Sequence, residues 1–379
     1  MNHAIILVSV CAGLVGISYG MYAPLVPVFS IEELGADYSQ VGIIGMANYL
    51  PYMFAPFFVG LVLDRTNKSY VLAAGVALAG ISVYMLSSAD SVPEVIFLRL
   101  MAGVAHALFW PSSEVLISAN SDTGKRVRGI SFFIAAWILG FMVGPLLGTL
   151  VLDLYDFRIL FQAASIVALA GIVPSLFLRH YGAPAPGAML NLRASDVLQV
   201  GREMSRYPAV SAVLLYYAVT FGVVLAVYPA YMGEAAISSQ NIEYLFFFFG
   251  VSRFATLYFV PRLSGHGILA LSLAVAATAV GMLISFAFAS FLGFAAALVL
   301  VGLATSIFYP ITFSIVTKNT PLNKMGQKLG AYETMFGIGW AIGPLAVGFS
   351  SNSFGSSSPY LGLFVIGTAL AAALAVAKR

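Results

Sequence analysis

The chain has 379 residues, of which 60% are hydrophobic and only 9% are charged, and its mean hydropathy is +0.96. This composition excludes a soluble globular protein, in which roughly 45–50% of residues are apolar and about 25% are charged. The formal net charge of +3 and the single cysteine, Cys11, indicate neither a nucleic-acid partner nor a disulfide framework.

Twelve apolar stretches follow one another along the chain, each long enough for a bilayer crossing of about 20 residues. We expect spans at residues 4–30, 40–63, 69–89, 94–119, 129–152 and 158–178, and then at 209–232, 242–260, 267–289, 291–317, 328–350 and 358–376. The first lacks a cleavage pattern and should remain as a helix. The sequence therefore predicts an all-α integral membrane protein with both termini on one side.

A polar segment between the sixth and seventh spans divides the chain. We expect an N-terminal six-helix bundle at 1–178, a linker at 179–208 and a C-terminal six-helix bundle at 209–379. Within the linker, Val197, Val200 and Met204 recur at helical spacing, which predicts a short amphipathic helix on the membrane surface.

Basic residues are distributed unequally between the two sides. Fifteen of the 18 Lys and Arg residues fall in alternate connections or at the C-terminus, whereas the opposite connections hold only Arg158 among acids that include Glu32, Asp37 and Glu243. The positive-inside rule predicts that both termini are cytoplasmic. The plasma membrane is the expected location.

The two halves also contain an internal repeat. A shift of 199 residues places Gly103, Phe109 and Pro111 on Gly302, Phe308 and Pro310. The same shift continues through the next span, where Gly140, Gly144 and Pro145 fall on Gly339, Gly343 and Pro344, in a pattern that in the first copy extends to Gly148. Six crossings separate the copies, so we expect parallel repeats about an axis normal to the membrane.

The connection between the second and third spans carries a recognisable motif. Its sequence from Gly60 to Lys68, with Asp64 and Arg65, resembles the signature loop of the major facilitator superfamily, although Asn67 replaces a second glycine. Arg99 with Gly103 resembles the second signature of that family. The run from Gly140 to Gly148 is similar to a fifth-span motif of its drug/proton antiporters.

This resemblance implies a twelve-helix fold in two six-helix repeats, no enzymatic activity and transport by alternating access. It also implies that the first, fourth, seventh and tenth spans form the cavity wall. We interpret Gly60, Asp64, Arg65 and Lys68 as a conformational latch, and the glycine and proline run as a helix-packing motif. The second copy of the loop keeps Arg262 but has no acid.

Polar side chains follow one face of the fourth span. At about 100° per residue, His106, Trp110 and Glu114 lie within about 60° of Arg99 around the helix. Exposing this polar face to lipid would be unfavourable, so we expect it to face a cavity. The repeat places Thr305 and Tyr309 opposite His106 and Trp110. The predicted substrate pathway comprises Tyr22, Arg99, His106, Trp110, Tyr217, Thr305 and Tyr309.

Three groups are candidates for proton coupling: Glu114 first, then His106, whose side chain type titrates near neutral pH, and Glu333. Each has a structural alternative, such as an inner-gate ion pair for Glu114. For Glu333 and Arg253 we favour a structural role, with an ion pair between them as one option, because neither lies on an expected cavity helix.

The leading hypothesis is proton-coupled efflux of a small amphipathic solute by a monomer in the lipid bilayer. The alternative is a proton symporter or uniporter that takes up an organic anion, with Arg99 and Arg253 as counter-charges, or another small nutrient. No filter sequence, phosphate loop, metal cluster or nucleophile elbow is apparent. We therefore expect no channel, enzyme, metal or cofactor.

Overall fold

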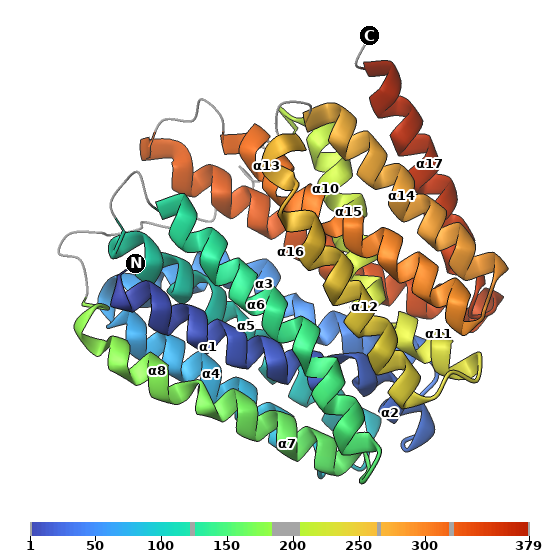
Figure 1. The fold of residues 1–379 in the computed structure, drawn as a ribbon, viewed down its shortest axis with the longest axis horizontal. Helices are drawn as coiled ribbons and strands as arrows, with labels where there is room; N and C mark the ends of the chain where they lie inside the picture. Colours follow the sequence, from blue (N-terminus) through green and yellow to red (C-terminus); the bar gives the residue numbers. More distant parts are fainter. Residues whose placement is uncertain (1, 122–125, 184–204, 264–266, 318–321, 378–379) are drawn as a thin grey trace.

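A computed structural model describes residues 2–121, 126–183, 205–263, 267–317 and 322–377. The described residues are almost entirely helical (Figure 1). The helices of the first half are α1 (His3–Tyr22), η1 (Ala23–Leu25), α2 (Val26–Glu32), α3 (Tyr38–Arg65), α4 (Lys68–Leu86), α5 (Val92–Ala119), α6 (Arg126–Leu152), α7 (Phe157–Ala170), α8 (Ile172–Phe177) and η2 (Leu178–His180). Those of the second half are α10 (Pro208–Ala226), α11 (Tyr228–Glu234), α12 (Ser239–Leu257), α13 (Val260–Leu263), α14 (Gly267–Ala287), α15 (Phe291–Thr317), α16 (Leu322–Phe354) and α17 (Ser358–Ala377).

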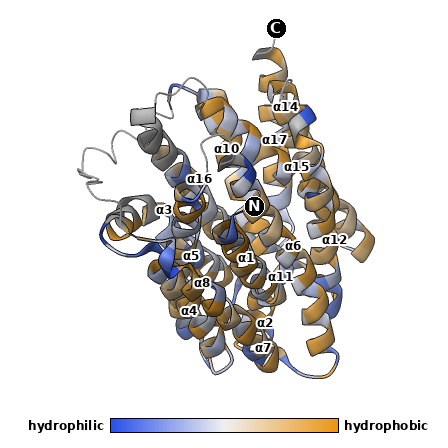
Figure 2. Ribbon diagram, turned by 60° about the vertical axis from the view of Figure 1, so that its left-hand side comes forward, coloured by the Kyte–Doolittle hydropathy of each residue, from blue (hydrophilic) through white to orange (hydrophobic). Residues whose placement is uncertain are grey.

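All twelve predicted spans coincide with helices, and the twelve-helix architecture is confirmed. Ten described segments are long and apolar enough to cross a membrane, and α3 and α12 occupy the positions of the second and eighth spans. Hydrophobic residues cover the lengths of the helices, and hydrophilic residues gather at their ends (Figure 2). The amphipathic helix predicted in the linker lies within 184–204, outside the described residues.

Proline breaks the first helix of each half at a similar place. The sequence around Pro24 converts the end of α1 into η1 and α2, and Pro229 follows the break between α10 and α11. Prolines also lie inside α5, α6, α15 and α16, where neighbouring helices can satisfy the freed backbone groups. The free thiol of Cys11 is fully buried in α1 and faces the Gly171 carbonyl oxygen at 3.5 Å.

Glycines allow close contact between helices within each half. A Cβ atom added to Gly144 of α6 would lie 2.8 Å from the Gly20 Cα of α1, and one added to Gly343 of α16 would lie 2.9 Å from the Val219 Cα of α10. The predicted glycine and proline motif thus lies at equivalent helix contacts in both halves. Backbones this close gain packing contacts that larger side chains would prevent.

The bundle has two different ends. We call the end with the connections 33–37, 87–91, 153–156 and 235–238 the acidic end, and the end with Asn2, Asn67 and Asn120 the terminal end. In Figure 1 the two halves meet where α2 and α11 lie and diverge in the opposite direction. The α3 and α16 pair and the α6 and α12 pair form the main contacts between the halves.

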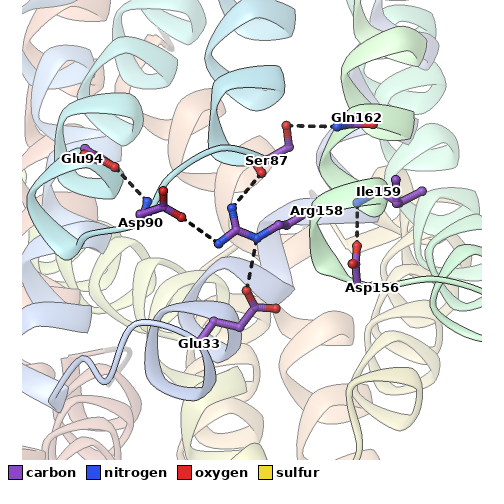
Figure 3. Close-up of polar contacts among 8 residues, drawn as sticks. All are labelled: Glu33, Ser87, Asp90, Glu94, Asp156, Arg158, Ile159 and Gln162. Carbon is purple, nitrogen blue, oxygen red and sulfur yellow. Dashed lines mark hydrogen bonds and ion pairs between the residues drawn. The ribbon is translucent and has the colours of Figure 1, made fainter.

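Arg158, predicted in a connection, lies at the start of α7 at the acidic end. Its guanidinium donates to Asp90 Oδ1 at 2.9 Å and to the Ser87 carbonyl oxygen at 3.1 Å, and it lies 3.5 Å from Glu33 Oε2 (Figure 3). It thereby links the start of α7 to the connections 33–37 and 87–91, all within the first half.

Glu243 lies in a helix and not in the predicted connection. It is fully buried in α12, and its carboxyl group lies toward Gly148 of α6.

Candidate substrate and proton site

A cavity with about 1090 Å³ of empty volume lies between the two halves. Its walls come from α1, α3, α5 and α6 of the first half and from α10, α12, α15 and α16 of the second. The predicted cavity helices α1, α5, α10 and α15 therefore supply only part of the lining, because α3, α6, α12 and α16 also reach it.

Aromatic rings form much of the wall. Trp340 of α16 stacks on Phe221 with ring centroids 5.6 Å apart, and it contacts Tyr49 at 4.9 Å and Phe336 at 4.4 Å. The chain has three tryptophans, Trp110, Trp137 and Trp340, and all of them line the cavity. Such a surface suits an amphipathic solute with an aromatic or aliphatic body.

Glu333 of α16 receives hydrogen bonds from both halves. Tyr309 of α15 donates to Glu333 Oε1 at 2.7 Å, and Tyr52 of α3 donates to Glu333 Oε2 at 3.0 Å. The interpretation of Glu333 as a residue away from the cavity is wrong, because its side chain lines it. Glu333 reaches the cavity because α16 packs along α3 at the boundary between the halves.

Glu114 and His106 of α5 also line the cavity, as the polar stripe predicted. Glu114 is close enough to Glu333 for the two carboxylates to interact electrostatically. The His106 ring packs edge-on against Tyr19 of α1, with centroids 5.0 Å apart. Two carboxyl groups and one imidazole thus share a largely apolar space, where an ionised group interacts more strongly with its neighbours than it would in water.

Arg253 of α12 is the other charged group in the cavity wall, although α12 is not one of the predicted cavity helices. Its guanidinium lies over the rings of Phe221 at 5.0 Å and Phe249 at 5.4 Å. Its Nε and Nη1 atoms are buried and have no hydrogen-bond partner among the described residues. The suggested ion pair between Arg253 and Glu333 is not among the ion pairs that the described residues form.

The structure separates the predicted substrate residues into two groups. His106, Trp110, Tyr217, Thr305 and Tyr309 line the cavity. Arg99 and Tyr22 do not. The Arg99 side chain is 2% exposed and lies over the Tyr22 ring at 5.7 Å, with Nη1 3.5 Å from the Tyr22 hydroxyl oxygen. Arg99 therefore neither reaches the solute space nor extends to the surface.

Trp110 and Tyr309, which the repeat places opposite each other, line the same cavity from different halves. Trp110 packs on Phe133 and Trp137 of α6, whereas Tyr309 stacks on Phe313 and contacts Phe336. The repeat relation places these two aromatics correctly on opposite helices, but each packs within its own half. Sequence reasoning found neither Tyr52 nor Trp340, since a lone aromatic in an apolar span gives no signal for a cavity.

The structure describes the latch motif only in part. The exposure of Gly60 and the side chain of Asp64 are outside the part of the chain that the structure describes. Arg65 is exposed at the end of α3, and Lys68 is buried at the start of α4, where its ammonium group donates to the Ala183 carbonyl oxygen at 3.0 Å. Lys68 thus anchors the chain after η2, and a latch between conformations stays a prediction.

The family model described as Major Facilitator Superfamily matches residues 8–344 and 265–379. An uncharacterised MFS-type transporter of Methanocaldococcus jannaschii is 22% identical over 359 residues, with 90% of this chain and 89% of that protein covered. The quinolone resistance protein NorA of Staphylococcus aureus is 23% identical over 180 residues, which cover 48% of this chain and 46% of NorA.

Solved structures share the fold at low sequence identity. A variant of the nucleoside transporter NupG superposes with a TM-score of 0.81 at 14% identity, over 99% of this chain and all of that one. A bacterial homologue of the human lysosomal transporter Spinster, in an inward-facing and occupied conformation, gives a TM-score of 0.77 at 13% identity over 99% and 96% of the two chains. A peptide transporter, POT, gives 0.79 at 14% identity over 99% and 94%.

Proposed function

The chain belongs to the major facilitator superfamily of multi-pass membrane transporters, and from this premise we propose that it exports a small amphipathic solute in exchange for protons. The arrangement around Glu333 is the observation that carries this proposal. One carboxyl group accepts a hydrogen bond from each half of the molecule, inside a cavity that a solute could enter.

Proton binding at Glu333 would change how the halves are joined. The ionised carboxylate accepts from Tyr52 of the first half and from Tyr309 of the second, and hydrogen bonds to an ionised acceptor are roughly twice as strong as those between neutral groups. A proton on either oxygen of Glu333 weakens the hydrogen bond that this oxygen accepts from its tyrosine. Protonation therefore favours an arrangement in which α3 and α16 separate, which is the link that alternating access requires.

The observed arrangement corresponds to one of the states that export requires. The halves are in contact at the acidic end, where Tyr38 of α3 donates to Glu234 and Gly42 lies against α16. If the acidic end is external, as the positive-inside rule predicts, contact between the halves at that end closes the external side. In an exporter, this is the state in which Glu333 would release its proton inward and the cavity would accept a solute.

Purified protein in liposomes with an internal pH dye tests the proposal. Lipophilic cations and organic anions are added in turn, and a solute-triggered proton flux is expected for the native chain. Glu333→Gln should lower that flux at least tenfold while solute binding persists, and Tyr52→Phe should lower it severalfold because Tyr309 still donates. Glu32→Gln is the matched control, since Glu32 is exposed at the end of α2.

Three results would contradict the proposal in different ways. A native chain that moves solute with no proton movement is a uniporter. Normal proton coupling in Glu333→Gln would indicate that Glu114 carries the proton instead. The variant Glu114→Gln would then test that assignment. Proton movement in the same direction as an added organic anion would establish the second candidate, uptake by symport, which the unpaired charge of Arg253 favours.

A further inference from the structure

Arg253 carries a charge that the protein does not neutralise. Its side chain is 7% exposed, it lines the cavity, and none of the described carboxylates forms an ion pair with it. A buried charge without a counter-charge is costly. Because an arginine stays protonated in proteins, this positive charge persists in every state of the transport cycle.

Four aromatic rings hold the guanidinium without cancelling its charge. Besides Phe221 and Phe249 of the second half, Trp137 and Phe141 of α6 lie 5.9 Å from it. Cation–π contacts of this kind attract the guanidinium to the faces of the rings. The cage therefore fixes Arg253 beside the solute space and leaves its attraction for an anion in place.

Negative charge is available elsewhere in the same cavity. Glu333 and Glu114 line it together, and the Glu333 oxygens are bound by tyrosines. Tyr217 of α10 interacts electrostatically with both Arg253 and Glu333, which places it near both charges. The cavity thus presents a positive site and a negative site, with aromatic rings such as Trp340 and Phe336 in its wall.

The geometry points to an aromatic zwitterion as the transported solute, with its anionic group at Arg253 and its cationic group at the Glu114 and Glu333 carboxylates. This inference rests on the proposed proton exchange, and it explains that exchange: a bound cationic group and a proton compete for the same carboxylates. A solute with both charges neutralises Arg253 and a carboxylate together, whereas a simple cation leaves Arg253 unpaired.

Binding to the purified protein tests the inference without transport. The probes are 4-(aminomethyl)benzoate and the longer 4′-(aminomethyl)biphenyl-4-carboxylate, each compared with its carboxamide, which lacks the anion, and its N-acetyl derivative, which lacks the cation. Calorimetry gives the affinities. Tryptophan fluorescence reports occupancy of this cavity, because all three tryptophans line it.

For at least one ring length we expect the zwitterion to bind at least tenfold more tightly than either singly charged analogue. Arg253→Gln should remove the preference for the zwitterion over the carboxamide. Arg253→Lys keeps the positive charge and should retain part of this preference, and it serves as the test if the glutamine variant fails to fold. Glu333→Gln should reduce the preference over the N-acetyl compound. Arg262→Gln is the matched control, since Arg262 lies over the Tyr258 ring at 4.8 Å but is exposed outside the cavity.

Equal binding of the zwitterion and its carboxamide would overturn the inference, as would a carboxylate preference that survives in Arg253→Gln. Tight binding of the N-acetyl compound would also overturn it, in favour of organic anions. These outcomes differ from failure of the proposed function. Proton exchange driven only by a simple cation would support the proposed function and contradict the zwitterion inference. Zwitterion binding without any proton movement would support the inference and contradict the proposed function.

Discussion

At the acidic end of the bundle, Gly42 of α3 packs against Pro344 and Gly348 of α16, and Tyr38 donates a hydrogen bond across the halves to Glu234. Toward the terminal end, hydrogen bonds join segments within each half, and in the second half Ser272 of α14 donates to the Ala371 carbonyl oxygen of α17 at 3.2 Å. In the first half the bonds come from asparagines. Asn120 donates to the Tyr181 carbonyl oxygen at 3.1 Å, and Asn67 donates to that of Arg179 at 2.8 Å. Contacts at the acidic end therefore hold the halves together, whereas the hydrogen bonds toward the terminal end stabilise each half separately.

The largest effect should come from separating the halves at the acidic end. A Cβ atom on Gly42 would lie 2.7 Å from the Pro344 carbonyl oxygen and 3.0 Å from the Gly348 Cα. Gly42→Leu should therefore disfavour the observed conformation by about 1–3 kcal/mol, the usual cost of overpacking. Distances between spin labels placed across this end should lengthen.

Gly362→Leu provides the control for that variant, because a Cβ atom at Gly362 meets no atom within 4 Å. It adds the same side chain to α17 and should change neither the distances nor transport. Unchanged distances in Gly42→Leu would show that the α3 and α16 contact does not hold the acidic end closed.

A smaller effect at the same end is expected from Tyr38→Phe, which removes the hydroxyl group that donates to Glu234. Hydrogen bonds to charged groups contribute about 1.5–3 kcal/mol, and partial exposure should reduce this to about 1 kcal/mol. The population with a separated acidic end should rise roughly fivefold by the same distance measurement. Tyr70→Phe, at an exposed position of α4, should leave it unchanged.

At the terminal end, Asn120→Ala should lower stability without altering the balance of conformations. It removes donations to the carbonyl oxygens of Tyr181 and Leu116, each contributing about 1 kcal/mol. Thermal unfolding in detergent should show a lower midpoint than in Asn352→Ala, whose residue is exposed on α16. A change in the spin-label distances would refute the division of roles between the two ends.

The smallest effect is expected for Arg158→Gln, although this residue joins Glu33, Asp90 and the Ser87 carbonyl oxygen. About a third of its side chain is exposed, and exposed ion pairs contribute at most about 1 kcal/mol. A slightly lower unfolding midpoint that becomes indistinguishable from the native value at high salt would confirm this. A large loss of stability would mean that the network supports the whole first half.

Sequence reasoning predicted the helices well and the site in part, for a physical reason. Apolar length defines a span, so the helix positions follow from local composition. Helical periodicity also placed His106, Trp110 and Glu114 on one face, and all three line the cavity. Periodicity cannot show which face meets which neighbour, so the sequence predicts neither that Glu333 and Arg253 line the cavity nor that Arg99 lies outside it.

Cys11 has a practical consequence. It is the only cysteine of the chain, and its thiol is fully buried against Gly171. A thiol reagent added to the folded protein should therefore leave the native chain unlabelled and modify only cysteines introduced at exposed positions. Single cysteines introduced at either end can therefore be labelled with dyes that report its opening. No native residue has to be replaced first to prevent background labelling.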